Sequence, residues 1–165
     1  MEYATTLSKE KTVSNDNNLN GWEGPEEPEE GWIKLNLDAA VSENVTALAV
    51  VARNKNGEVL IVWAKKHEWC SPLQAEAAAV LWAIWLALSE NWQHIIIKGD
   101  AKSCFDPLII SELQHDWSVA TIIINILDLR NFFLNCNFRW VRCCNTAAHE
   151  AAKYAIRFCG EFYFN

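Results

Sequence analysis

The sequence predicts an α/β fold in which helices pack on a mixed β-sheet. Three apolar runs follow one another between residues 32 and 65, and the last two flank a turn that ends in Asn56-Gly57, which is typical of antiparallel strands. From residue 71 onwards, helical and strand patterns alternate. An antiparallel meander followed by alternating helix and strand implies a mixed sheet with helices packed on it.

The length and composition fit one such domain. The chain has 165 residues, of which 51% are hydrophobic and 21% are charged, so it can build one core but not two comfortable ones. Nine tryptophans are more than a single small core can enclose, and some of the rings are expected at the surface.

The first 31 residues are expected to form a flexible acidic leader, and residues 32–165 the folded domain. Residues 1–31 contain eight acidic side chains and two lysines, which account for −6 of the net charge of −7. The run Glu23–Glu30, interrupted by Pro25 and Pro28, has too little apolar surface to fold. The near-neutral remainder lacks the basic character of many nucleic-acid-binding domains, although bound divalent cations can supply positive charge locally.

Three strands are expected first. Trp32–Asp38 alternates apolar and polar residues, as a strand with one buried face does. Val45–Arg53 is a second apolar run, and Glu58–Lys65 follows the Asn56-Gly57 turn as the third.

A long helix and a fourth strand come next. Ser71 and Pro72 supply an N-cap and a proline at the first helical position. Gln74–Glu90 then contains strong helix formers without an internal Gly or Pro. His94–Lys98 is a short apolar strand that ends at Gly99-Asp100.

Two further helices and a fifth strand follow. One helix is expected near Ala101–Phe105, ending before Pro107, because proline disrupts a helix interior. A second helix is expected over Val119–Phe133, and Phe138–Arg142 alternates as a strand.

The last element is a helix over Thr146–Phe158, with Asn145 as a candidate N-cap. The predicted order is therefore strand, strand, strand, helix, strand, helix, helix, strand, helix, with no internal repeat.

Three acidic residues are candidates for a functional site. Asp38 lies on the same face of the first strand as Asn36, in an apolar setting where an unpaired charge is costly. Glu76 lies in the first turn of the long helix, where an acid also complements the helix dipole. Asp100 follows the fourth strand, where acids often cap a helix. Each residue has a structural explanation by itself, but their combination with this order of elements favours a shared site.

Several short motifs accompany these acids in a fixed order. They are Leu35–Asp38, Arg53–Gly57, Cys70–Ala77, Ile97–Lys102, Val141–His149 and Ala151–Ala155. With these motifs the chain resembles the ribonuclease H family, specifically the plant ribonuclease H-like domains associated with retroelement reverse transcriptases. The resemblance covers about residues 32–159. It implies a ribonuclease H-like fold, with a five-stranded mixed sheet made of an antiparallel meander and two parallel strands, and with helices on both faces.

The resemblance also implies a metal-dependent endoribonuclease that hydrolyses the RNA strand of RNA–DNA hybrids. Asp38, Glu76 and Asp100 would hold two Mg²⁺ or Mn²⁺ ions, which are hard cations that prefer oxygen ligands. Two ions about 4 Å apart would activate a water and stabilise the departing 3′ oxygen. Contacts to the 2′-hydroxyl would distinguish ribose from deoxyribose.

The chain departs from the family pattern at the fourth acid, whose matching position is His149. A catalytic role for His149 and a structural role at the start of the last helix are both open. Imidazole is a poorer ligand than carboxylate for Mg²⁺. Neighbouring Glu150 points about 100° away around the helix, which disfavours it as the substitute.

Glycines are also missing where the family usually has them. Asp38 is followed by Ala39-Ala40, and no glycine occurs between Gly31 and Gly57. Because glycine permits close approach of the backbone to a ligand, Cβ atoms at these positions are expected to reduce catalytic efficiency.

Ser71 and Lys102 are the candidate substrate-binding residues. Ser71 could contact the nucleic-acid backbone near Glu76, and Lys102 could meet a phosphate just beyond Asp100. Lys65-Lys66 is a weaker candidate, since paired lysines are usually a solvated surface.

The protein is expected to be an intracellular monomer, nuclear or cytoplasmic. Six cysteines without paired metal-binding spacing indicate reduced thiols. No signal peptide is apparent, and the apolar stretch Ala75–Leu88 is short enough to be a buried helix rather than a membrane span.

Three alternatives to an active hybrid nuclease stay open. The first is a nucleic-acid-binding module, a domesticated retroelement remnant that has kept the fold and lost turnover. The second is a protein-interaction domain that uses the acidic leader and the surplus tryptophans. The third, a 3′–5′ exonuclease of similar topology, is disfavoured by the order of the hairpin strands and by the Ser71–Glu76 motif.

Overall fold

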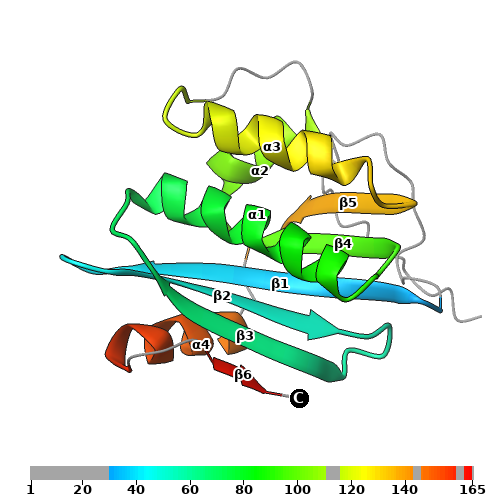
Figure 1. The fold of residues 1–165 in the computed structure, drawn as a ribbon, viewed down its shortest axis with the longest axis horizontal. Coiled ribbons are helices and arrows are strands. Elements are labelled where there is room, and N and C mark those ends of the chain that lie inside the picture. Colours follow the sequence, from blue (N-terminus) through cyan, green and yellow to red (C-terminus); the bar gives the residue numbers. More distant parts are fainter. Residues whose placement is uncertain (1–29, 111–115, 143–145, 159–161, 165) are drawn as a thin grey trace, which may run out of the picture.

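In a computed structural model of the chain, residues 30–110, 116–142, 146–158 and 162–164 are described. The acidic leader, apart from its last two residues, and Asn145 lie outside these ranges. The elements, in chain order, are β1 (Trp32–Val41), β2 (Thr46–Arg53), β3 (Val59–His67), α1 (Pro72–Ser89), β4 (His94–Gly99), α2 (Lys102–Ile109), α3 (Ala120–Arg130), β5 (Asn135–Trp140), α4 (Thr146–Arg157) and β6 (Phe162–Phe164). Figure 1 shows their arrangement.

The strands form one mixed sheet in the order β5-β4-β1-β2-β3-β6. β1, β2 and β3 pair antiparallel as the predicted meander. β4 pairs parallel with β1, and β5 pairs parallel with β4, so the predicted mixed sheet is confirmed. The sixth strand was not predicted. β6 pairs antiparallel with β3 over only three residues, which is too short a segment to show an alternating pattern.

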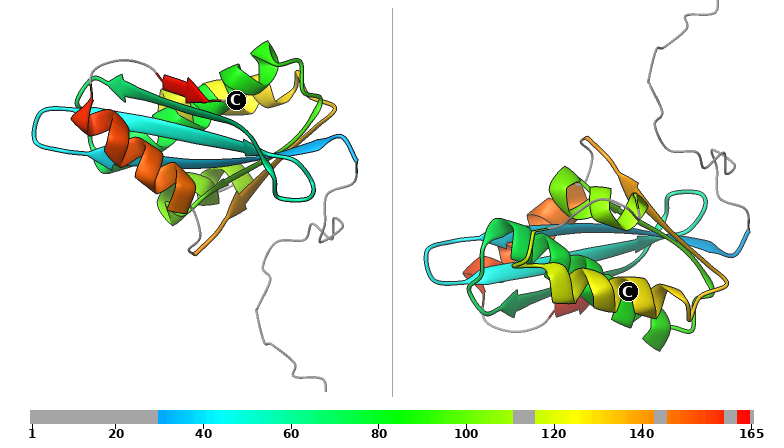
Figure 2. Two further views of the ribbon diagram at one scale, coloured as in Figure 1. Left: turned by 90° about the horizontal axis from the view of Figure 1, so that it is seen from below. Right: turned by 90° about the horizontal axis from the view of Figure 1, so that it is seen from above.

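Helices cover both faces of the sheet because successive strand residues point to opposite sides. Leu35 and Leu37 point to the face covered by α1 and belong to the main core. Ala47 and Ala49 on β2 belong to a second, smaller cluster that includes residues of α4. Alanines on both the strand and the helix allow α4 to lie close to the sheet. Figure 2 shows α4 on the opposite side of the sheet from α1 and α3.

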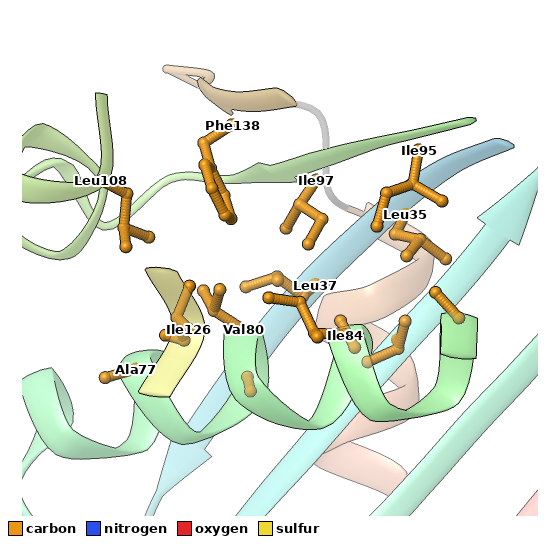
Figure 3. Packing of buried hydrophobic residues seen from close by; sticks show 14 of the residues in the cluster. Leu35, Leu37, Ala77, Val80, Ile84, Ile95, Ile97, Leu108, Ile126 and Phe138 are labelled. Carbon is orange, nitrogen blue, oxygen red and sulfur yellow. The ribbon is translucent and has the colours of Figure 1, made fainter. Parts of the chain in front are cut away.

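The long helix α1 begins with the predicted cap. The Ser71 hydroxyl accepts a hydrogen bond from the Gln74 backbone N–H, while the Gln74 side chain accepts one from the Ser71 N–H, and Pro72 opens the helix. By length and composition α1 could cross a membrane. In this fold, seven of its residues are buried, among them Val80 and Ile84, and they pack against the strand residues shown in Figure 3.

Several predicted bounds are wrong. β1 continues beyond Asp38 to Val41, because its pairing with β2 extends to Val41 and Thr46. α2 continues through Pro107 to Ile109, since burial of Phe105 and Leu108 in the core outweighs the one backbone hydrogen bond that proline removes. α3 is shorter than predicted at both ends. β5 begins at Asn135 rather than Phe138 and ends at Trp140, because pairing with β4 sets its register.

Gly99, the last residue of β4, is required by close packing. A Cβ atom at this position would lie 2.6 Å from Cε2 of the buried Phe105 ring and 3.0 Å from a methyl carbon of Leu37. We expect Gly99→Ala to destabilise the fold by roughly 1–3 kcal/mol, as measured by urea unfolding. In a double-mutant cycle with Phe105→Leu, the two losses should total more than the loss in the double variant, because the smaller side chain relieves the clash. Additive losses would show that Phe105 does not impose the requirement for glycine.

Candidate functional site

The three predicted acids meet at one edge of the sheet. β1 and β4 are parallel neighbours, and Asn36 pairs with Lys98. Asp38 and Asp100 each follow by two residues, so the parallel register brings them side by side, with Asp38 inside β1 and Asp100 directly after the end of β4. Glu76 lies in the second turn of α1 and not in the predicted first turn, because the helix already begins at Pro72. α1 packs across β1 (Figure 1).

The structure brings these carboxylates close enough to share a ligand. One oxygen from each of Asp38, Glu76 and Asp100 lies within 4.8 Å of the other two. Asp38 is buried, Glu76 is partly buried and Asp100 is exposed. The cluster therefore opens to solvent on the side of Asp100 and is closed beneath Asp38.

Burial and mutual repulsion disfavour charge on the two inner acids. Desolvation, followed by the nearby charges of Asp38 and Asp100, raises the pKa of Glu76 to about 8. Burial also raises the pKa of Asp38, although a hydrogen bond and the charge of His149 act in the opposite direction. Removing a carboxylate from water in this way is costly unless a positive partner is present.

The cluster fits a divalent cation. Glu76 Oε2 is fully buried and has no hydrogen-bond partner among the described residues, which is unusual for a native side chain. Together the three acids offer oxygen donors to a hard cation such as Mg²⁺, Mn²⁺ or Ca²⁺. A bound cation would satisfy the orphaned oxygen and remove the repulsion at the same time.

His149, at the start of α4, joins the site from the other face of the sheet. Its Nδ1 lies 2.8 Å from Asp38 Oδ2, and its side chain is 50% exposed. The ring does not belong to the group of three that share the 4.8 Å cluster. The structure thus places all four predicted residues at one site, with His149 beside Asp38 rather than among the acids.

The two candidate substrate-binding residues have structural contacts of their own. Ser71 caps α1, and it lies five residues before Glu76. The Lys102 ammonium lies 3.8 Å from Asp106 and 5.9 Å from the centre of the Trp140 ring. Both stay predictions as substrate contacts.

Trp140 supports the site, a role that no local pattern in the sequence indicated. Its indole Nε1 donates a hydrogen bond to the Asp100 backbone carbonyl at 2.9 Å, and the next residue, Val141, donates from its backbone N–H to the Gly99 carbonyl at 2.9 Å. The end of β5 therefore holds the backbone at Asp100. Only the pairing of β5 with β4 could have revealed this contact.

A row of basic residues on the same face of the sheet as Asp38 was also missed. Lys34 and Asn36 precede Asp38 at alternate positions of β1, and Lys98 pairs with Asn36 on one side and Arg139 on the other. Burial, followed by the charges of Lys34 and Arg139, lowers the pKa of Lys98. Their separation in sequence hid this local positive charge in a chain that is acidic as a whole.

Comparison with known proteins agrees with this geometry. A family model described as reverse transcriptase-like matches residues 36–155, a span that includes all four residues of the site. No curated protein matches the chain.

Among solved structures, RNase H1 from the halophilic archaeon Halobacterium salinarum NRC-1 is similar with a TM-score of 0.71 and 19% identity, covering 76% of this chain and 98% of that one. The N-terminal RNase H domain of a Mycobacterium tuberculosis protein has a TM-score of 0.69 and 16% identity, covering 76% and 94%. LC11-RNase H1 in complex with an RNA/DNA hybrid has a TM-score of 0.68 and 16% identity, covering 76% and 96%. At these low identities, the likeness establishes the fold alone.

Proposed function

Because the chain belongs to the reverse transcriptase-like family and has an RNase H-like fold, we propose that it is a metal-dependent endoribonuclease that hydrolyses the RNA strand of RNA–DNA hybrids. The observation that carries the proposal is the meeting of Asp38, Glu76 and Asp100 within 4.8 Å. A purely structural role would leave such a cluster paired with basic side chains, whereas Glu76 Oε2 has no partner among the described residues.

Asp38, Glu76 and Asp100 would hold Mg²⁺ or Mn²⁺, two ions in the family pattern. When bound, these cations activate a water and stabilise charge on the phosphodiester. The chain itself contributes orientation. β1 fixes Asp38 in a buried position, α1 holds Glu76 above it, and the Trp140 hydrogen bond holds the backbone of Asp100.

Recognition of nucleic acid is supported by charge near the site. Lys34, Lys98 and Arg139 lie on the sheet face that carries Asp38, and strand geometry places Lys34 about 13 Å from Asp38. Basic side chains at this range can contact backbone phosphates on one side of a scissile bond. One of the similar structures, LC11-RNase H1, was solved with an RNA/DNA hybrid, which motivates the choice of substrate.

The decisive experiment is cleavage of a hybrid labelled on its RNA strand. We expect the wild-type chain to produce shorter RNA with Mg²⁺ or Mn²⁺ and none with EDTA, and to leave labelled DNA intact. Asp100→Asn should lower the rate roughly 10²-fold or more, equal to about 3 kcal/mol. Asp100 is exposed, so this change should spare the fold. Asp128→Asn, which changes an acid on α3, is the matched control and should cleave like wild type. Equal rates for all three proteins would refute the proposal.

A hybrid-binding module without turnover is the second candidate. It is favoured by Ala39 and Ala40 after Asp38 and by His149 beside Asp38. Metal-dependent retention of the hybrid with no product over a long incubation would support it, and loss of binding even at low salt would exclude it.

We further propose that the chain acts as a monomer inside the cell, in the nucleus or cytoplasm. Among the described cysteines, Cys70, Cys104 and Cys136 are free thiols, as a reducing compartment requires. Fractionation of cells that express a tagged chain, with size-exclusion chromatography of the soluble extract, would test both points.

A further inference from the structure

His149 makes a side-chain hydrogen bond to the buried end of the site. The imidazole Nδ1 and Asp38 Oδ2 are 2.8 Å apart, although 111 residues separate them in sequence. The Asp38 side chain is 8% exposed, and it is the most deeply buried member of the cluster. His149 therefore contacts a carboxylate that has little access to water.

The direction of this hydrogen bond follows from chemistry. A carboxylate that binds a cation is ionised and can only accept hydrogen bonds. Nδ1 must then carry the proton and donate to Oδ2. One lone-pair direction of Oδ2 is used by the imidazole, and the Ala39 backbone N–H also hydrogen-bonds to the Asp38 and Glu76 carboxylates. Glu76 Oε2 has no partner among the described residues and stays available to a cation.

A second cation would meet two obstacles on the His149 side. It would face an N–H hydrogen rather than a lone pair at Oδ2, and displacing His149 would lose a hydrogen bond to a charged group. It would also lack compensating charge. Three carboxylates carry −3, so one dication leaves −1, whereas two dications leave +1 and repel each other at short range.

We propose that this chain binds one divalent cation tightly, through Asp38, Glu76 and Asp100, and that His149 takes the place of a second cation by hydrogen bonding to Asp38. The inference rests on the proposed function only in taking the acid cluster as a metal site. It predicts that this chain binds the second ion of the family pattern with an affinity at least about tenfold lower than that for the first ion.

The test is a titration of the metal-free, full-length chain with Mn²⁺, in which free Mn²⁺ is measured by electron paramagnetic resonance at fixed pH. We expect one tightly bound Mn²⁺ per wild-type chain and two per His149→Asp chain. Two tight ions in the wild type would overturn the proposal, as would a folded His149→Asp chain that still binds only one.

Unfolding of the metal-free His149→Asp chain is checked separately, because this variant places a fourth carboxylate beside Asp38. Its thermal unfolding is followed with and without Mn²⁺. His149→Gln adds no charge and should bind one tight ion, as the wild type does. A second tight ion in His149→Gln would show that loss of the imidazole is enough to admit it without a fourth carboxylate, which would support exclusion by His149 and overturn the charge argument.

Glu150→Gln tests whether the neighbouring acid is a ligand. Glu150 pairs with Lys153 at 3.6 Å, and the variant should bind one ion as the wild type does. A loss of tight binding in Glu150→Gln would identify Glu150 as a ligand. It would overturn the assignment of the tight cation to Asp38, Glu76 and Asp100 alone.

The outcomes separate this inference from the proposed nuclease. Cleavage of the hybrid by a wild-type chain that holds two tight ions would leave the nuclease standing and reject the role of His149. One tight ion without any cleavage would support the role of His149 and reject the nuclease.

Discussion

Asp38→Asn should lower the rate of hybrid cleavage by about 10³-fold or more, equal to about 4 kcal/mol of transition-state stabilisation. Asp38 is the buried acid of the cluster, and it contacts both the shared ligand position and His149. Asparagine keeps the shape of the side chain and removes the charge, so it is a poor ligand for a hard cation. The measurement is the single-turnover rate with saturating enzyme, which isolates the chemical step from product release.

The fold of Asp38→Asn should survive, which makes the loss of rate interpretable. Removing a buried negative charge relieves the repulsion that Asp38 imposes on Glu76, and asparagine can still hydrogen-bond His149. We expect the midpoint of thermal unfolding in EDTA to stay the same or to rise. A large loss of stability, or a rate close to that of Asp128→Asn, would contradict the role given to Asp38.

Glu76→Gln should remove most of the pH dependence of stability of the metal-free chain. Below about pH 4.5, the usual pKa of Glu, both folded and unfolded states bind the Glu76 proton, and the group has no effect on stability. Between this value and the folded pKa of about 8, the unfolded state loses the proton while the folded state keeps it. The free energy of unfolding therefore falls as the pH rises, by a total on the order of 5 kcal/mol above pH 8.

The raised pKa of Asp38 acts in the same direction. We expect urea unfolding in EDTA to show a wild-type chain that is clearly less stable at pH 8 than at pH 5, and a Glu76→Gln chain with a much flatter profile. The glutamine amide is itself poorly satisfied at this buried position, which costs about 1–3 kcal/mol, so the net gain at pH 8 should be about 2–4 kcal/mol. Parallel profiles for the two proteins would show that Glu76 is hydrated and not buried.

Bound metal should reverse the order of stability of the wild type and Glu76→Gln at pH 8. At a cation concentration 1,000 times its dissociation constant, binding to the folded state alone stabilises the wild type by about 4.1 kcal/mol. Glu76→Gln has lost one ligand and should gain little. The sign of the difference between the two proteins at pH 8 should therefore change between EDTA and saturating Mn²⁺.

Much of the fold was predictable because local chemistry determines it. The alternation in β1, the Asn56-Gly57 turn and the cap of α1 at Ser71 and Gln74 each act within a few residues. The boundaries that failed depend on distant partners. β6 exists only by pairing with β3, and α2 passes Pro107 because Phe105 and Leu108 reach the core.

The sequence by itself indicated which acids lie near strand ends and helix starts, and their order along the chain predicted one common site at Asp38, Glu76 and Asp100. Only the tertiary structure decided their charge states and their neighbours. The unsatisfied oxygen of Glu76, its pKa of about 8 and the contact of His149 with Asp38 all arise from packing two faces of a sheet against helices that lie far apart in the chain. Burial and through-space charge depend on distances that no local pattern encodes, and for this reason the site was predictable while its electrostatics were not.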